Sequence, residues 1–234
     1  MVPLPRSFLP GGWLKMRVPI MHGFSSQLVP RPRDWGDHLT VTGYWFLEDT
    51  PGWKPQRELA EFMDAGDAPV YVGFGSMKTR QPSSTARIVL KALERANKRA
   101  VFQGGWAGLH DVEFPSSVFK LDAVSHDWLF SRSAALIHHG GGGTTGTGLR
   151  SGTPTITIPF YADQPFWGHR VAAIGAGPPP ISRKRLAVEV LSETIQVATN
   201  SIGIKTRASQ IGEQIRVENG IANAVAFITR VLER

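Results

Sequence analysis

The sequence predicts an α/β fold with a doubly wound parallel sheet. From about residue 56 onward, short apolar strands alternate with longer amphipathic helices, which is the pattern of a parallel sheet covered by helices on both faces. Apolar residues make up 41% of the 234-residue chain, enough to fill a packed core. Glycines collect where strands are expected to end, and in this fold class the ligands bind at such junctions.

Residues 1–55 are expected to form an irregular segment rich in proline and tryptophan. They hold 8 of the 17 prolines and 4 of the 7 tryptophans and show no sustained periodicity. Only residues 41–47 (VTGYWFL) are expected to form a short strand. Exposed tryptophans in a linker would be costly, so we expect this segment to lie on another surface. The sequence therefore predicts a boundary between residues 1–55 and a folded domain at 56–234.

The folded domain is expected to contain short apolar strands and helices with apolar residues at helical spacing. The expected strands are residues 69–76, 99–105, 116–122, 134–139 and 153–159. The expected helices are residues 83–98, a stretch that begins near Gly143, and residues 164–176, 184–199, 202–218 and 221–233.

Composition narrows the classes of function. The chain has no cysteine, which excludes a disulfide framework, a thiolate zinc site and a cysteine nucleophile and favours a reducing cytoplasm. Its net charge of +7 favours anionic partners, but no basic stripe interleaved with aromatic residues marks a nucleic-acid site. No apolar run reaches the roughly 20 residues of a membrane span, and the starting segment lacks a signal-peptide core. We expect a cytoplasmic protein without nucleic acid or transmembrane segment, with peripheral membrane contact left open.

The stretch HHGGGGTT (138–145) lies between an expected strand and an expected helix. Gly140–Gly143 would let the backbone approach an anion without obstruction by Cβ atoms. Thr144 adds a hydroxyl at the helix start, where free N–H groups and the positive dipole end favour negative charge. Since side chains alternate along a strand, we expect His139 to contact the ligand and His138 to be structural. The sequence therefore predicts a phosphate or diphosphate site.

Other interpretations of these glycines remain. Four glycines can form a tight turn that serves packing alone. Gly141, Gly143 and Gly146 also match GxGxxG, and Asp163 lies about twenty residues on, as in a dinucleotide site. That fold places the fingerprint after its first strand and the ribose-binding acid at a strand end, whereas here only one strand follows the glycines and Asp163 stands in a loop. A Walker loop is excluded because the chain has no Gly-Lys dipeptide.

Polar or small residues follow other strands as well. Asp163 and Gln164 come after the last expected strand, and a carboxylate beside an amide can hydrogen-bond the vicinal hydroxyls of a sugar. The alternative is that Asp163 only caps the helix that follows. Residues 73–76 (GFGS) could add a phosphate contact or form a plain turn. Residues 124–130 could flank a base.

Four segments, in order and spacing, resemble the UDP-glycosyltransferases of GT-B architecture, particularly the bacterial and fungal branch similar to sterol glucosyltransferases. The segments are VYVGFGSM (70–77), SHDWLF (125–130), HHGGGGTTGTGLRSGTP (138–154) and PFYADQPFWGHRVAAIGAGP (159–178). The resemblance runs from about Gly23 to the C-terminus. It implies the Rossmann-like C-terminal half of a GT-B fold, which binds the nucleotide-sugar donor. Residues 1–55 would then be the remnant of an acceptor domain and the linker between domains.

The resemblance also implies roles for individual residues. The residues expected to bind the donor diphosphate are Ser76, His139, Gly141, Gly142, Gly143 and Thr144. Asp163 and Gln164 are expected to bind the sugar, and Val124 and His126 to line the uracil. The chain departs from the family pattern at Ser125, where proline is usual, and at Gly142, where alanine or serine is commoner.

The implied reaction is hexosyl transfer with inversion from a UDP-sugar to a hydroxyl of a lipophilic acceptor such as a sterol. A base deprotonates the acceptor, and we expect that base in a missing N-terminal domain, so no catalytic residue is assigned. No metal and no cofactor besides the UDP-sugar co-substrate are expected. The isolated chain is expected to be inactive without an acceptor domain, which a separate chain could supply. The alternative is a non-catalytic nucleotide-sugar-binding subunit or a truncated product.

Overall fold

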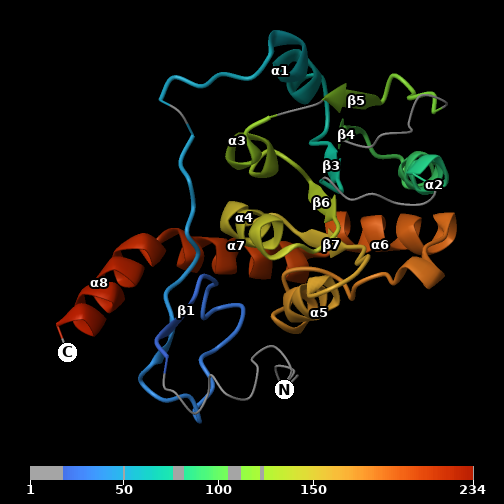
Figure 1. Cartoon of the computed structure of the whole chain (residues 1–234). Coiled ribbons are helices and arrows are strands. Elements are labelled where there is room, and N and C mark those ends of the chain that lie inside the picture. The colour runs from blue at the N-terminus through green and yellow to red at the C-terminus, as the bar shows by residue number, and fades with distance from the viewer. Residues whose placement is uncertain (1–17, 50, 76–81, 105–111, 122–123, 234) are drawn as a thin grey trace. The chain divides into compact units, whose positions relative to one another are not determined.

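The computed structural model describes residues 18–49, 51–75, 82–104, 112–121 and 124–233 (Figure 1). The chain divides into two compact units, Leu47–Val217 and the combination of Met1–Phe46 with Glu218–Arg234. The C-terminal helix thus groups with the N-terminal segment. The expected boundary between residues 55 and 56 stays a prediction.

The larger unit contains a five-stranded parallel sheet with the strand order β5-β4-β3-β6-β7. Every neighbouring pair in it is parallel, which confirms the predicted sheet type. Each strand lies inside a range expected from the sequence. The strands are β3 (Val70–Gly73), β4 (Ala100–Gln103), β5 (Val118–Leu121), β6 (Ala135–His138) and β7 (Thr155–Thr157).

Helices follow the strands in the order that the sequence predicts, with two additions. They are α1 (Arg57–Asp64), α2 (Pro82–Arg95), α3 (His126–Phe130), α4 (Gly142–Ser151), α5 (Gln164–Ala173), α6 (Val188–Asn200) and α7 (Ile202–Arg216). The helix expected from residue 184 starts at Val188 because Arg183–Arg185 form a separate 3-10 turn and Ala187 is extended. The expected loop at 124–130 contains α3, since Ser125 Oγ accepts a hydrogen bond from Trp128 N (3.2 Å) and caps it.

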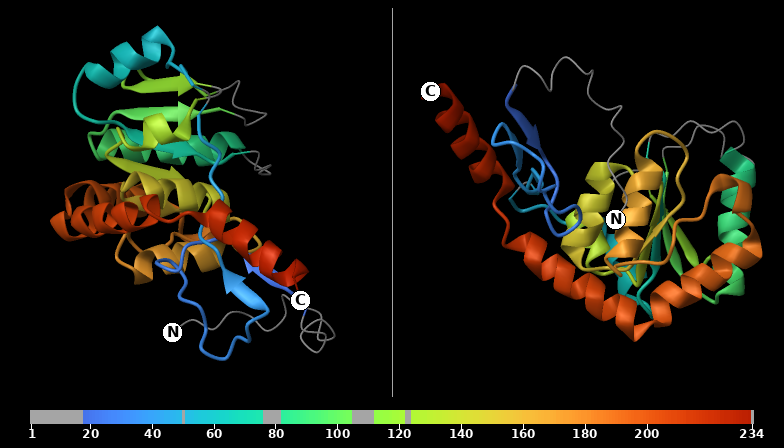
Figure 2. Two further views of the ribbon diagram at one scale, coloured as in Figure 1. Left: turned by 90° about the vertical axis from the view of Figure 1, so that its left-hand side faces the viewer. Right: turned by 90° about the horizontal axis from the view of Figure 1, so that it is seen from below.

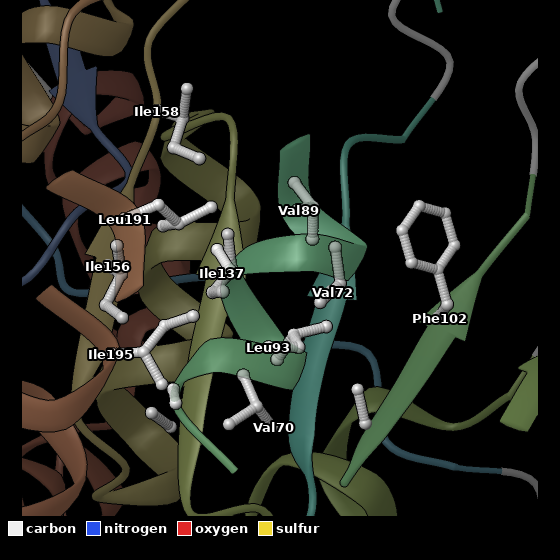
Figure 3. Close-up of a cluster of buried hydrophobic side chains, with 14 of the residues drawn as sticks. Val70, Val72, Val89, Leu93, Phe102, Ile137, Ile156, Ile158, Leu191 and Ile195 are labelled. Carbon is white, nitrogen blue, oxygen red and sulfur yellow. The ribbon is translucent and has the colours of Figure 1, made fainter. Parts of the chain in front are cut away.

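The side chains on the two faces of the sheet belong to two separate hydrophobic clusters. Successive residues of a strand point to opposite faces, so Leu136 and Ile137 of β6 enter different clusters. Ile137 packs with Val89 of α2 and Leu191 of α6 (Figure 3), and the right-hand view of Figure 2 shows both helices on that side. Leu136 packs with side chains of α1 and α3. Each fully buried side chain of this size contributes roughly 1.5–3 kcal/mol, so the core fixes the spacing of the strand ends.

The strand register places four residues in one row at the carboxyl edge of the sheet. Gly73 of β3 pairs with Gln103 of β4 on one side and with His138 of β6 on the other. His138 in turn pairs with Thr157 of β7. Open α/β sheets bind ligands outside this edge. The histidine and glycine motifs therefore reach the same edge of one sheet.

In its described residues, the second unit has two short parallel strands, β1 (Ile20–His22) and β2 (Leu39–Val41), and the helix α8 (Gly220–Leu232). The strand expected at 41–47 was wrong, because β2 ends where the expected strand should begin. Thr42 then turns back to donate to the carbonyl of His22 (3.2 Å), and Gly43 follows with a φ of 94°. Such a φ is compatible with glycine and interrupts an extended strand.

Candidate functional site

The start of helix α4 has backbone features that favour an anion. Gly140 follows β6 with a φ of 86°, which requires glycine, and it turns the chain into the helix. The N-cap residue is Gly141, which has no side chain to cap the first turn, and that turn contains no acidic residue. The first N–H groups of a helix have no partner within it and carry the positive end of its dipole. These groups of α4 therefore suit a phosphate.

The two histidines before this turn occupy different environments. The His138 side chain is fully buried, and its Nδ1 accepts a hydrogen bond from Gly140 N (2.9 Å). Burial, with smaller contributions from His139 and His126, lowers the pKa of His138 to about 3. His139 instead lines a pocket, as the alternation along the strand predicts. Burial lowers the pKa of His139, and the nearby Asp163 carboxylate acts in the opposite direction. Both rings are therefore neutral near pH 7.

His139 Nδ1 has no hydrogen-bond partner within the described part of the chain, although the atom is buried. A buried polar atom without a partner costs free energy, so a ligand that bonded to this nitrogen would remove that cost. The ring lies close to the glycines, because a methyl group on Gly141 would come within 2.5 Å of His139 Nε2. His139 and the start of α4 therefore form one site.

The glycines of this loop serve different neighbours. Gly141 leaves room for the His139 ring, and a methyl group on Gly142 would lie 3.2 Å from Nε1 of Trp167. A methyl group on Gly143 would meet no atom within 4 Å in the part of the chain that the structure describes. Packing within the chain therefore explains the first two glycines and leaves the third open to a ligand.

A pocket of about 290 Å³ opens beside these residues at the carboxyl edge of the sheet. Three elements of the predicted site meet there, since His139, Thr144 and His126 share its wall. The described residues that line it are Tyr71, Gly73, Gly75, Gln103, Gly104, His126, His139 and Thr144. Because β3 lies between β4 and β6, the pocket spans two strand spacings, about 10 Å. That span matches an extended ligand such as a nucleotide.

The Asp163–Gln164 pair lies next to the glycine turn. Gln164 contacts Gly140, since a methyl group there would come 3.0 Å from the Gln164 carbonyl oxygen. The Gln164 side chain is only 4% exposed, and its Oε1 accepts from the backbone N–H groups of Phe160 (2.8 Å) and Tyr161 (3.2 Å). Asp163 is partly exposed, and its Oδ2 accepts from Trp167 Nε1 (2.6 Å). Asp163 stands at the N-cap of α5 but makes no side-chain cap bond.

Val124 is not part of the pocket lining and packs against the cluster of α1 and α3. Ser76 lies outside the described residues. Conversely, Tyr71, Gln103 and Gly104 line the pocket but were not among the residues predicted from the sequence. The signal for Gln103 was available, because a polar residue at the carboxyl end of a buried strand followed by glycines points to the same edge.

The described ranges contain neither a candidate metal site nor a helix that could span a membrane. No three His, Asp or Glu side chains there are grouped so that they could hold a metal ion. None of the helices that the structure describes combines the length and apolar character needed to span a bilayer.

Comparison with known proteins gives the family. Residues 104–222, just over half of the chain, match the model of the erythromycin biosynthesis protein CIII-like C-terminal domain. The chain belongs to this family. The matched region contains α3, the glycine turn and the Asp163–Gln164 pair, so most of the candidate site lies within the family domain.

Curated proteins similar to this chain include sterol glucosyltransferases. The chain is 41% identical over 209 residues to the sterol 3-beta-glucosyltransferase UGT80A2 of Arabidopsis thaliana, with 88% of this chain and 33% of the relative covered. It is 42% identical over 229 residues to the sterol 3-beta-glucosyltransferase of Emericella nidulans, with 93% of this chain and 16% of the relative covered. The chain thus spans a third or less of the length of these relatives.

Solved structures with the same fold are glycosyltransferases. The calicheamicin glycosyltransferase CalG4 superposes with a TM-score of 0.72 at 18% identity, over 92% of this chain and 52% of that chain. The glycosyltransferase of kitacinnamycin gives a TM-score of 0.73 at 20% identity, over 90% of this chain and 54% of that chain. The family domain therefore has the fold of one half of a GT-B glycosyltransferase, which confirms the predicted fold class.

Proposed function

We propose that this chain is the donor-binding half of an inverting UDP-glycosyltransferase. In this role it binds a UDP-hexose, and the hexose passes to a hydroxyl of a lipophilic acceptor such as a sterol. The observation that carries the proposal is the start of α4, which has no acidic residue and no side-chain cap, beside the buried His139 Nδ1, which has no partner among the described residues. The names of the curated relatives support the sugar and the acceptor.

The chemistry follows from charge. As the bond from C1 to the diphosphate breaks, negative charge grows on the leaving UDP. The N–H groups at the start of α4, the hydroxyl of Thr144 and the ring of His139 are placed to stabilise that charge. An oriented donor of this kind is typically worth about 3 kcal/mol in the transition state. We propose Asp163 and Gln164 as the sugar contacts, since they adjoin this turn.

The acceptor site and the general base are proposed to lie in the other half of the protein that the relatives carry. A cytoplasmic location, which the absence of cysteine favours, stays a prediction. No cofactor besides the nucleotide sugar is assigned.

Titration calorimetry with UDP tests the donor site. Gly143→Ala is the sharpest variant, because the methyl group has open space in the free chain but would stand where a diphosphate approaches the helix start. We expect it to stabilise the fold by roughly 0.5–1 kcal/mol, as alanine does in a helix, and to weaken UDP binding at least about tenfold.

Gly203→Ala is the matched control. Gly203 is likewise the second residue of a helix, α7, and a methyl group there meets only Ser201 Oγ at 3.9 Å. It should give a similar gain in stability with unchanged UDP affinity. Equal UDP affinities for the two variants would contradict the diphosphate site. Binding of NAD without binding of UDP would establish the dinucleotide interpretation in its place.

A further inference from the structure

Three polar side chains from three elements meet at one end of the pocket. Gln103 Oε1, at the end of β4, lies 2.5 Å from the hydroxyl of Tyr71 on β3 and 2.9 Å from Nε2 of His126 on α3. The Tyr71 hydroxyl also lies 3.4 Å from the same ring nitrogen. Gly73 makes this arrangement possible, because any Cβ there would collide with the Tyr71 hydroxyl.

The Gln103 oxygen determines the protonation of the His126 ring. A carbonyl oxygen can only accept, so it receives the Tyr71 O–H and the His126 Nε2–H, and the unprotonated nitrogen is Nδ1. The ring plane is fixed as well, since it stacks on Phe130 with centroids 4.5 Å apart and meets the Tyr71 ring edge-on. Burial lowers the pKa of His126, which keeps the ring neutral at pH 7.

We propose that Tyr71 and Gln103 are positioning residues that hold His126 Nδ1 as a hydrogen-bond acceptor for the base of the nucleotide, and that this makes the pocket select uracil over cytosine. The inference rests on the proposed function. Uracil presents an N–H at position 3 and cytosine presents a lone pair there. If cytosine were bound, its lone pair at position 3 would face the lone pair of His126 Nδ1, and neither acceptor would have a donor. Binding of cytosine would then carry the free-energy cost of unsatisfied buried polar groups.

The position of the cluster supports this assignment. Gln103 and His126 come from β4 and α3, whereas His139 and Thr144 come from β6 and α4, so β3 separates the two ends of the pocket. Two strand spacings, about 10 Å, separate the two ends, and we take this as the room for a ribose between the diphosphate and the base. Gly73 and Gly75 line the pocket between the two ends, and the absence of a Cβ at Gly73 leaves room for the Tyr71 hydroxyl. A diphosphate at α4 thus brings the base to His126.

The test compares UDP and CDP by calorimetry in the full chain and in Gln103→Met. We expect the unmodified chain to bind UDP about tenfold to hundredfold more tightly than CDP, and Gln103→Met to bring the two within about threefold. Inorganic pyrophosphate, which has no base, should bind equally to both proteins and reports an intact fold and diphosphate site. The nitrogen NMR spectrum of His126 should change from the single Nε2–H tautomer to a mixture.

Tyr71→Phe is the second variant, since it removes one hydroxyl and keeps the Gln103–His126 bond. It should lower the UDP preference by a smaller factor than Gln103→Met. The proposal is overturned if the unmodified chain binds UDP and CDP alike, or if Gln103→Met keeps the full preference while pyrophosphate binding is intact. Failure of the unmodified chain to bind either UDP or pyrophosphate is a different result, which contradicts the proposed function itself.

Discussion

His138 and His139 show how far neighbouring residues of one motif can differ. The His138 side chain is fully buried. Its Nδ1 accepts a hydrogen bond from the N–H of Gly140, a residue that lies beyond the end of strand β6. His139 faces the pocket with a buried nitrogen that has no partner among the described residues. The alternation of a strand explains the difference, and it was readable in advance because only one of two successive side chains can face the site.

The buried His138 ring predicts a pH dependence of stability. Its pKa is lowered from 6.5 to about 3, so the unfolded chain binds a proton that the folded chain does not. The contribution of His138 to the free energy of unfolding is fully present above the pKa of the unfolded chain. It is lost as pH falls between the unfolded and folded pKa values, at up to about 1.4 kcal/mol per pH unit. Chemical unfolding at pH 7, 6 and 5 should show this slope.

His138→Gln should flatten that slope while keeping an oxygen that can accept from Gly140 N. The remaining slope belongs to the other groups that titrate on unfolding. An unchanged slope in the variant would show that the buried imidazole is not neutral in the folded chain.

At the scale of elements, Arg150 joins three segments of the larger unit. From the last turn of α4 it donates to Asp127 Oδ2 on α3 (3.4 Å) and to Glu48 Oε1 (2.8 Å). Its backbone carbonyl accepts from Arg216 Nη1 of α7 (2.7 Å). Since α4 begins at the glycine turn and α3 carries His126, this side chain ties together the two helices that line the pocket.

Arg150→Met should therefore lower the free energy of unfolding by roughly 1–2 kcal/mol, because the half-buried Asp127 carboxylate loses its partner. Amide hydrogen exchange should quicken in α3, which is only five residues long. Arg95→Met is the control: its pair with Glu189 is longer, 3.6 Å, and both side chains are more than half exposed. A change within about 0.5 kcal/mol is expected there. Equal losses of unfolding free energy in the two variants would contradict the proposed role of Arg150 in joining α3 and α4.

The elements also show where sequence patterns stop being informative. The five strands of the sheet were predicted because each is a short apolar run that ends in turn residues. The same rule failed at 41–47, where the apolar run contains Gly43 with a positive φ and Tyr44 is buried by tertiary packing. The Tyr71–Gln103–His126 cluster was missed for a related reason. Its members are 23 to 55 residues apart, so only the strand order brings them together.

At the scale of the whole molecule, we expect UDP to change hydrogen exchange in one of the two units and not in the other. Binding of UDP to the native chain stabilises it by mass action, by about 2.7 kcal/mol at a hundredfold excess over the dissociation constant. The proposed site lies entirely within Leu47–Val217. Hydrogen exchange with and without UDP should therefore show new protection at the start of α4 and after β6. Exchange in α8, which belongs to the other unit, should stay the same. Protection confined to α8 would contradict the site.

The open space above Gly143 has an evolutionary corollary. If Gly143→Ala stabilises the fold and weakens the ligand site, as predicted above, then only function keeps this residue as glycine. Selection for thermal stability would favour alanine at this position, and only the accompanying loss of nucleotide-sugar binding would oppose that substitution. In descendants that no longer handle nucleotides, position 143 should be among the first of the loop glycines to disappear.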